Sequence, residues 1–172
     1  MGKVAPGNRM HHADEGIWDD GEWISWDEIN DHLEAQDLRE QYPNADIDVV
    51  YIFEGLIDCA VRYHAITNRH LDIWGELGEL FAEITYGLKR HKPKAAGSDG
   101  KIGNDFVEVK TISPFKGDDQ VLVKRKGNFN KLIVVTITTD YAFEARMIAR
   151  KDMPPGDGKF AKVRWRTMPS ES

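Results

Sequence analysis

The stretch GSDGKIGNDFVEVKT, residues 97–111, is where the pattern of the sequence changes and where its reactive side chains are closest together. From residue 105 to 112 it reads DFVEVKTI, in which apolar and charged residues alternate as on the two faces of a β-strand. Gly103 and Asn104 just before it are typical of a tight turn. We therefore expect a hairpin that folds the segment of Asp99 back beside the strand that carries Glu108.

The residues on either side of this stretch differ in their periodicity. Helical spacing predicts three helices before it: one capped by Ser25 and Glu28, one from about Asp48 to Thr67, and one that begins at Asp72 as N-cap. Alternating or apolar runs predict strands after it, at 105–112, 120–125, 131–138, 142–150 and 160–167. This order predicts an α+β fold in which N-terminal helices pack on a central mixed or antiparallel β-sheet.

The first part of the chain differs in composition from the rest. Residues 1–24 are rich in Gly, His, Asp and Glu, and we expect an extended or partly disordered lead-in there. We predict an acidic, tryptophan-containing extension over residues 1–45 and one domain over residues 46–172. At this length a domain buries enough apolar surface to fold without disulfides. The single cysteine, Cys59, lies in an apolar run, which predicts a buried, inert thiol.

The charges are distributed unevenly along the chain. Residues 1–86 carry 5 lysines and arginines against 19 aspartates and glutamates, whereas residues 87–172 carry 18 against 10. Such an asymmetry indicates that the basic half binds a polyanion, although acidic helices and basic strands could also attract one another within one fold. No apolar leader or long apolar run occurs, so we expect a cytoplasmic protein without a membrane partner.

The Glu108-Val109-Lys110 triplet suggests a particular chemistry. Glu108 and Lys110 are two residues apart on a strand, so their side chains leave the same face about 7 Å apart. Carboxylates hold Mg²⁺, and a nearby lysine can orient a water molecule and offset the charge that develops on a phosphate. Asp99, across the predicted turn, would supply the second carboxylate. Asp105 is a weaker candidate, because its place after the turn favours a role in the turn itself.

A third carboxylate could come from the preceding helix. Glu76, Glu79 and Glu83 form one acidic stripe there, and stacked like charges cost a few tenths of a kcal/mol per pair unless a cation lies opposite. A metal ion would remove that cost. The alternative is a solvated acidic helix face.

A Gly-Glu-Leu helix followed by GSDG and then VEVKT resembles the PD-(D/E)XK nuclease superfamily, over residues 72–139. The resemblance implies a restriction-endonuclease-like core, Mg²⁺ or Mn²⁺ as cofactor, and DNA as substrate. It also implies the catalytic residues Glu79, Asp99, Glu108 and Lys110, with the metal held by Asp99, Glu108, the Val109 carbonyl and Glu79. Two departures stand out. Ser98 replaces the family's proline, and KGDDQVLVKRKGNFNK (116–131) reads as strand and turn where the family has a helix.

The leading hypothesis is therefore a metal-dependent endonuclease that hydrolyses DNA. Basic clusters predict its phosphate contacts, namely Lys124, Arg125 and Lys126, with Arg164 and Arg166 on a later strand beside Lys162. The alternative is a non-catalytic DNA- or protein-binding module on the same fold. The acidic, tryptophan-containing segment would then serve as a homodimer contact or a partner surface, or as a lid over the basic groove.

Overall fold

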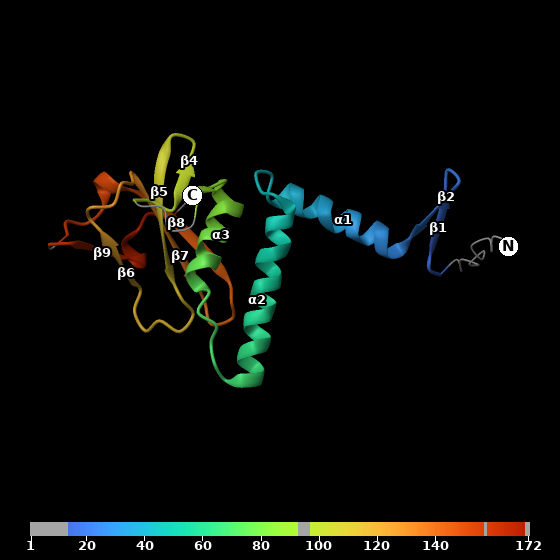
Figure 1. The fold of residues 1–172 in the computed structure, drawn as a ribbon, viewed down its shortest axis with the longest axis horizontal. Coiled ribbons are helices and arrows are strands. Elements are labelled where there is room, and N and C mark those ends of the chain that lie inside the picture. The colour runs from blue at the N-terminus through green and yellow to red at the C-terminus, as the bar shows by residue number, and fades with distance from the viewer. Residues whose placement is uncertain (1–13, 93–96, 157, 171–172) are drawn as a thin grey trace, which may run out of the picture. The chain divides into compact units, whose positions relative to one another are not determined.

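The computed structural model describes residues 14–92, 97–156 and 158–170 (Figure 1). The chain forms two compact units, residues 1–43 and 44–172. No helix in the described segments is both long enough and apolar enough to cross a membrane.

The first unit consists of a hairpin and one helix. Strands β1 (Gly16–Asp19) and β2 (Glu22–Ser25) pair antiparallel, and α1 (Trp26–Gln41) follows directly. The predicted capping box is confirmed, because Ser25 accepts the Glu28 N–H and the Glu28 carboxylate accepts the Ser25 N–H. The lead-in, residues 1–24, is extended as expected over its described residues. These residues pair into a hairpin, which was not predicted. Residues 1–13 lie outside the described part of the chain.

Two helices open the second unit. They are α2 (Ile47–Thr67) and α3 (Trp74–Tyr86). The side chain of Asp46 caps α2 by accepting the Asp48 N–H. Asp72 was expected to cap α3, and this is wrong: the N-cap is Ile73, whose side chain has no group that could accept a hydrogen bond. Packing rather than capping therefore defines the start of α3, since Trp74 and Leu77 are already buried in its first turn.

The sheet of this unit is mixed. Its order is β3 (Lys89–Arg90), β4 (Gly100–Ile102), β5 (Asp105–Ile112), β7 (Lys131–Ile137) and β8 (Phe143–Ala149). β5 and β7 run parallel, and the other neighbours are antiparallel. β6 (Gln120–Lys124) pairs with β9 (Phe160–Arg164) in a separate two-stranded sheet. Short 3₁₀ turns cover Arg150–Asp152 and Trp165–Thr167.

The two faces of the central sheet have different cover. On one face α3 approaches β5 so closely that a Cβ at Gly78 would lie 2.0 Å from the Thr111 hydroxyl oxygen. On the same side Phe53 of α2 packs edge-on against Phe143 of β8, at 4.9 Å between ring centroids. The other face meets the β6–β9 pair in an apolar core built around Ile112, Val121, Val123, Phe129, Leu132, Val134, Val163 and Met168. The predicted α+β fold with a mixed sheet is confirmed (Figure 1).

Two predictions about single segments have opposite outcomes. Residues 116–131 contain the strand β6 flanked by turns and end at the first residue of β7, so they read as strand and turn, as their pattern predicted. Cys59, in contrast, is exposed rather than buried. The buried positions of α2 are Val50, Phe53 and Ala60, and Cys59 points away from that face because it precedes Ala60 by one residue, about 100° of helical rotation.

Candidate active site

The hairpin of β4 and β5 positions Asp99. This residue lies one place before β4, where its N–H donates to the Val107 carbonyl at 2.9 Å and its carbonyl accepts the His91 N–H at 2.8 Å. Its side chain turns toward β5, and Oδ2 accepts the Val109 N–H at 2.7 Å. The carboxylate of Asp99 is therefore fixed beside the residue that separates Glu108 from Lys110.

Glu108 and Lys110 lie on one face of β5, as the alternation predicted. The Lys110 ammonium contacts Glu108 Oε1 at 2.6 Å and donates to the Val109 carbonyl at 3.1 Å. The side chains are 15% and 31% exposed for Glu108 and Lys110, so this pair is shielded from water more than a surface ion pair is. The Lys110 ammonium therefore binds both the Glu108 carboxylate and the Val109 carbonyl oxygen.

A pocket of about 330 Å³ joins these groups to the basic turn after β6. Asp99 and Glu108 line it together with Lys124 and Lys126, and the remaining lining residues are Gly97, Ser98 and Gly127. Within the described part of the chain neither lysine side chain has an ion pair or hydrogen-bond partner. The pocket therefore places two carboxylates beside two uncompensated cations, which suits a phosphate bridged to a metal ion.

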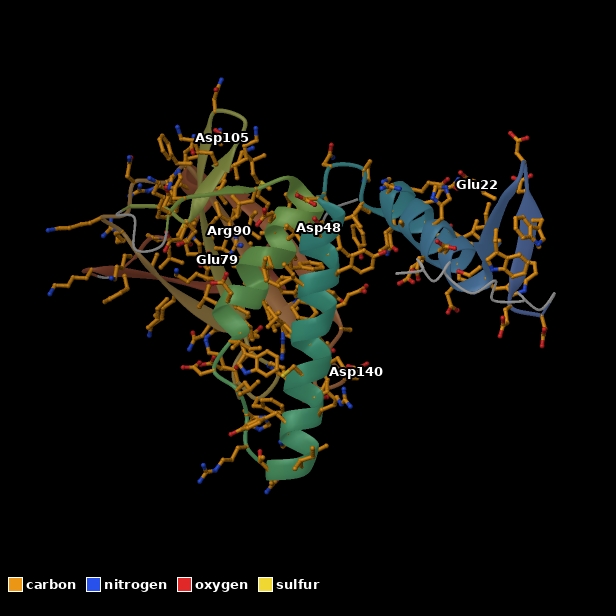
Figure 2. The ribbon with its side chains drawn as sticks, turned by 45° about the vertical axis from the view of Figure 1, so that its right-hand side comes forward. Glu22, Asp48, Glu79, Arg90, Asp105 and Asp140 are labelled. Carbon is orange, nitrogen blue, oxygen red and sulfur yellow. The ribbon has the colours of Figure 1, made fainter. Side chains whose placement is uncertain are left out.

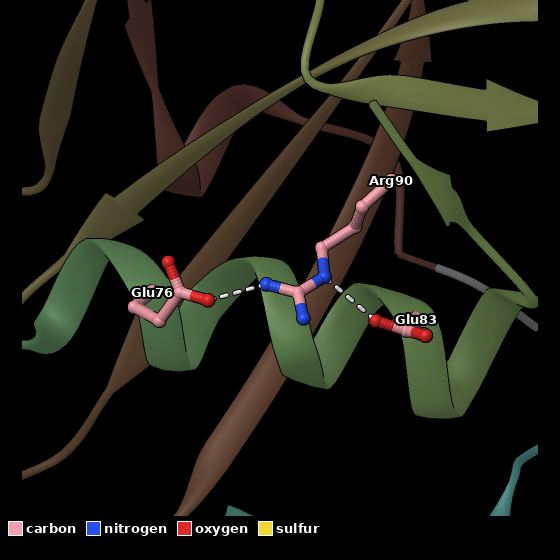
Figure 3. Close-up of polar contacts among 3 residues, drawn as sticks. All are labelled: Glu76, Glu83 and Arg90. Atoms are coloured by element: carbon pink, nitrogen blue, oxygen red, sulfur yellow. Dashed lines mark hydrogen bonds and ion pairs between the residues drawn. The ribbon is translucent and has the colours of Figure 1, made fainter. Parts of the chain in front are cut away.

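The acidic stripe of α3 is largely neutralised from the neighbouring strand. Arg90 of β3 binds Glu76 through one terminal nitrogen and Glu83 through Nε, the latter at 2.7 Å (Figure 3). Arginine suits this bridge because its planar guanidinium presents several donors in fixed directions. Of the three stacked glutamates, Glu79 alone has no ion pair to a described residue.

Glu79 lies on α3 near Arg90 (Figure 2), half-buried and close enough to the site to be affected by its charges. Burial raises the pKa of its carboxyl from 4.5 to about 7, and the negative charges of Asp99 and Glu76 act in the same direction. Arg90 and Lys110 oppose this rise only in part. Glu79 is not among the described residues that line the pocket.

The other predicted phosphate contacts divide into two groups. Lys124 and Lys126 reach the pocket, whereas Arg125 turns away and donates to the carbonyls of Gly156 and Gly158. Arg164 is exposed at the end of β9.

Arg166 was expected on the same strand face as Arg164, which is wrong. β9 ends at Arg164, and Arg166 lies in a 3₁₀ turn, where it pairs with Asp119 at 3.1 Å. Asp105 is occupied elsewhere, with Lys131 at 2.7 Å and Asn130 at 2.6 Å. Its expected role near the turn, rather than in the site, agrees with these contacts.

Two residues of this region were missed from the sequence. Arg90 has no partner at helical or strand spacing, so nothing local indicated its bridge to α3. His91 follows it, and its Nδ1 lies 3.2 Å from the Ser98 carbonyl oxygen and 3.4 Å from the Ser98 hydroxyl. Both contacts depend on the pairing of β3 with β4, which the two-residue strand β3 was too short to reveal.

The donor set is compatible with a hard divalent cation. One carboxylate oxygen of Asp99 is bound by no described group. The Lys110 ammonium, which is itself a cation, contacts the Glu108 carboxylate and the Val109 carbonyl oxygen. Burial is the main cause of the raised pKa of Glu79, and the negative charge of Asp99 adds to it. No group of three or more His, Cys, Asp or Glu side chains that could hold a metal ion occurs among the described residues.

No protein-family model matches the sequence, and no curated protein matches it.

Proposed function

We propose that this protein is a metal-dependent endonuclease that hydrolyses phosphodiester bonds in DNA. The observation that carries the proposal is the meeting of Asp99 and Glu108 with Lys124 and Lys126 in one pocket, where neither of these lysines has an ion pair with a described residue and the Asp99 carboxylate accepts the Val109 N–H. Carboxylates that hold a metal ion and cations that offset the charge on a phosphate both favour phosphodiester hydrolysis.

Each group of the site has a role in this proposal. Bound Mg²⁺ or Mn²⁺ would supply Lewis-acid chemistry, polarising the phosphate and making its water ligand a better nucleophile. Asp99, Glu108 and the Val109 carbonyl would hold that ion, and Glu79 would support it from the helix side. Lys110 would orient the attacking water and offset the negative charge that grows on the phosphate oxygens. Lys124 and Lys126 would bind the flanking phosphates.

The topology around the site supports a restriction-endonuclease-like core. A helix precedes an antiparallel run of β3, β4 and β5, and a crossover then leads to β7, parallel to β5. The crossover contains β6 where the superfamily has a helix, and β6 brings Lys124 to the pocket. We infer that β6, which replaces this helix, supplies Lys124 as a phosphate contact and leaves β4 and β5, which position Asp99 and Glu108, unchanged.

A second candidate function is DNA binding without cleavage. It is favoured by the contact of Lys110 with both Glu108 and the Val109 carbonyl, because a permanent ion pair there would compete with a metal ion. On this hypothesis the protein retains DNA but does not bind divalent ions at Asp99.

Incubation of supercoiled plasmid with Mg²⁺ or Mn²⁺ separates the two functions. We expect nicked and linear products from the wild type, and a loss of roughly 10²-fold or more in cleavage rate for Lys110→Ala, the size seen when one charge-stabilising donor is removed. Lys89→Ala, an exposed lysine on β3, is the matched control and should cut normally. Equal cutting by Lys110→Ala, or retention of DNA with no cutting by any protein, would count against catalysis.

A further inference from the structure

A second hollow adjoins the candidate active site. It has a volume of about 430 Å³ and lies between the turn after β6 and the loop that leads into β9. Its walls include Arg125, Lys126, Met153, Pro154, Pro155 and Gly156. Lys126 also lines the pocket that contains Asp99 and Glu108. A DNA strand bound at these two carboxylates would therefore run past Lys126 and reach the second pocket.

The lining of the second pocket combines apolar and cationic side chains. The apolar residues include Met153, Pro154 and Pro155, and the two prolines are exposed. Among the cationic residues, Arg125 donates to the Gly156 carbonyl at 3.3 Å, whereas Lys126 has no partner among the described residues. An occupant with an apolar ring and one attached anion matches this mixed lining, and a nucleotide has that composition.

Hydrogen bonds from Arg150 join two of the segments that line the pocket. Arg150 donates to the carbonyls of Gly127 at 2.6 Å and Phe129 at 3.0 Å, and its guanidinium lies 4.6 Å above the Phe129 ring. Gly156 is required by close approach, since a Cβ there would lie 2.5 Å from the Phe160 carbonyl oxygen. A preformed wall reduces the ordering cost of binding.

We propose that this pocket receives the base of an unpaired nucleotide beside the phosphate that is cleaved, which makes the preferred substrate a DNA with a bulged or single-stranded nucleotide at the cut. The proposal rests on the proposed nuclease function. A base inside a duplex is stacked and paired, so it cannot enter a concave pocket unless it leaves the helix, and an already unpaired base avoids that cost. The volume lies within the roughly 300–1,000 Å³ of small-molecule sites.

Fluorescence anisotropy in EDTA tests the pocket without cleavage. The probes are three labelled DNAs of one sequence: a full duplex, the duplex with one bulged adenine, and the same bulge with an abasic residue. We expect the wild type to bind the bulged adenine about tenfold more tightly than the duplex, as one stacked base allows, and the abasic bulge to lose most of that preference. Pro155→Glu should abolish the preference, and Pro169→Glu, an exposed proline elsewhere, should keep it.

The outcomes separate this inference from the nuclease assignment. Equal affinity for the three DNAs, binding to none of them, or an unchanged preference in Pro155→Glu would overturn the pocket assignment even if the wild type cuts plasmid. A clear preference for the bulged adenine in a protein that never cuts DNA would support the pocket and reject the nuclease.

Discussion

Arg90 determines which carboxylate of the acidic stripe is left without a counter-charge. Its guanidinium binds Glu76 and Glu83 and so removes the repulsion expected of stacked glutamates, without needing a metal for those two residues. Glu79 has no ion pair with a described residue, and burial together with the charges of Asp99 and Glu76 raises its pKa to about 7. Its carboxyl therefore changes protonation near neutral pH.

The raised pKa of Glu79 predicts how stability changes with pH. The unfolded chain releases this proton near 4.5 and the folded chain only near 7, so the folded state loses stability as pH rises between these values. Glu79→Gln should therefore raise Tm at pH 8 without metal, by roughly 2–4 °C for each kcal/mol recovered, and the gain should vanish below pH 4.5. Thermal scans across this range measure it. Glu54→Gln, an exposed glutamate of α2, is the control, and an equal gain in both variants or at both pH values would show that ionisation of buried Glu79 is not the cause.

Single residues of the site were predictable to different degrees. The spacing of Glu108 and Lys110 predicted their shared face, because a strand alternates its side chains, and the turn at Gly103 brought Asp99 alongside. Arg90 was not predictable, since its partners belong to another element and are reached through strand pairing. Local spacing carries no information about that pairing.

Contact between elements centres on the crossing of α3 and β5. Gly78 permits this contact, because any Cβ there would collide with Thr111 of β5. The same crossing sets the distance of Glu79 from Asp99, so the site depends on it.

Gly78→Ala should lower the free energy of unfolding by roughly 1–3 kcal/mol, the usual cost of overpacking a tight contact. Gly55→Ala is the matched control, since Gly55 lies inside α2 with nothing within 4 Å, and this exchange should stabilise by up to about 1 kcal/mol. Urea unfolding measures both. The double variant Gly78→Ala, Thr111→Ala should recover part of the loss, and a neutral or stabilising Gly78→Ala would show that the helix can move away freely.

Elements were predicted best where their signal is local. Alternation identified the strands after residue 104, and Ser25 with Glu28 identified the start of α1. The start of α3 was misplaced, because buried Trp74 fixes it rather than a polar cap. The first hairpin was missed although Asp20 and Gly21, both with positive φ, form its turn, since only four residues stand on each side.

At the scale of the whole molecule, the charge asymmetry has a structural counterpart. Residues 1–43 carry 11 aspartates and glutamates against 3 lysines and arginines and form a unit of their own, whereas the unpaired lysines belong to residues 44–172. The second pocket could not be predicted from the sequence, because its walls come from three separate segments.

The central claim is that separate segments of the chain create one divalent-cation site. Anomalous diffraction from crystals grown with Mn²⁺ tests it most directly, with Asp99→Asn crystals as the control. We predict one strong peak at bonding distance from the Asp99 and Glu108 carboxylates and the Val109 carbonyl, with Lys110 displaced from Glu108, and no peak in the variant. A Mn²⁺ peak elsewhere, or none while Lys110 keeps its contact with Glu108, would contradict the claim.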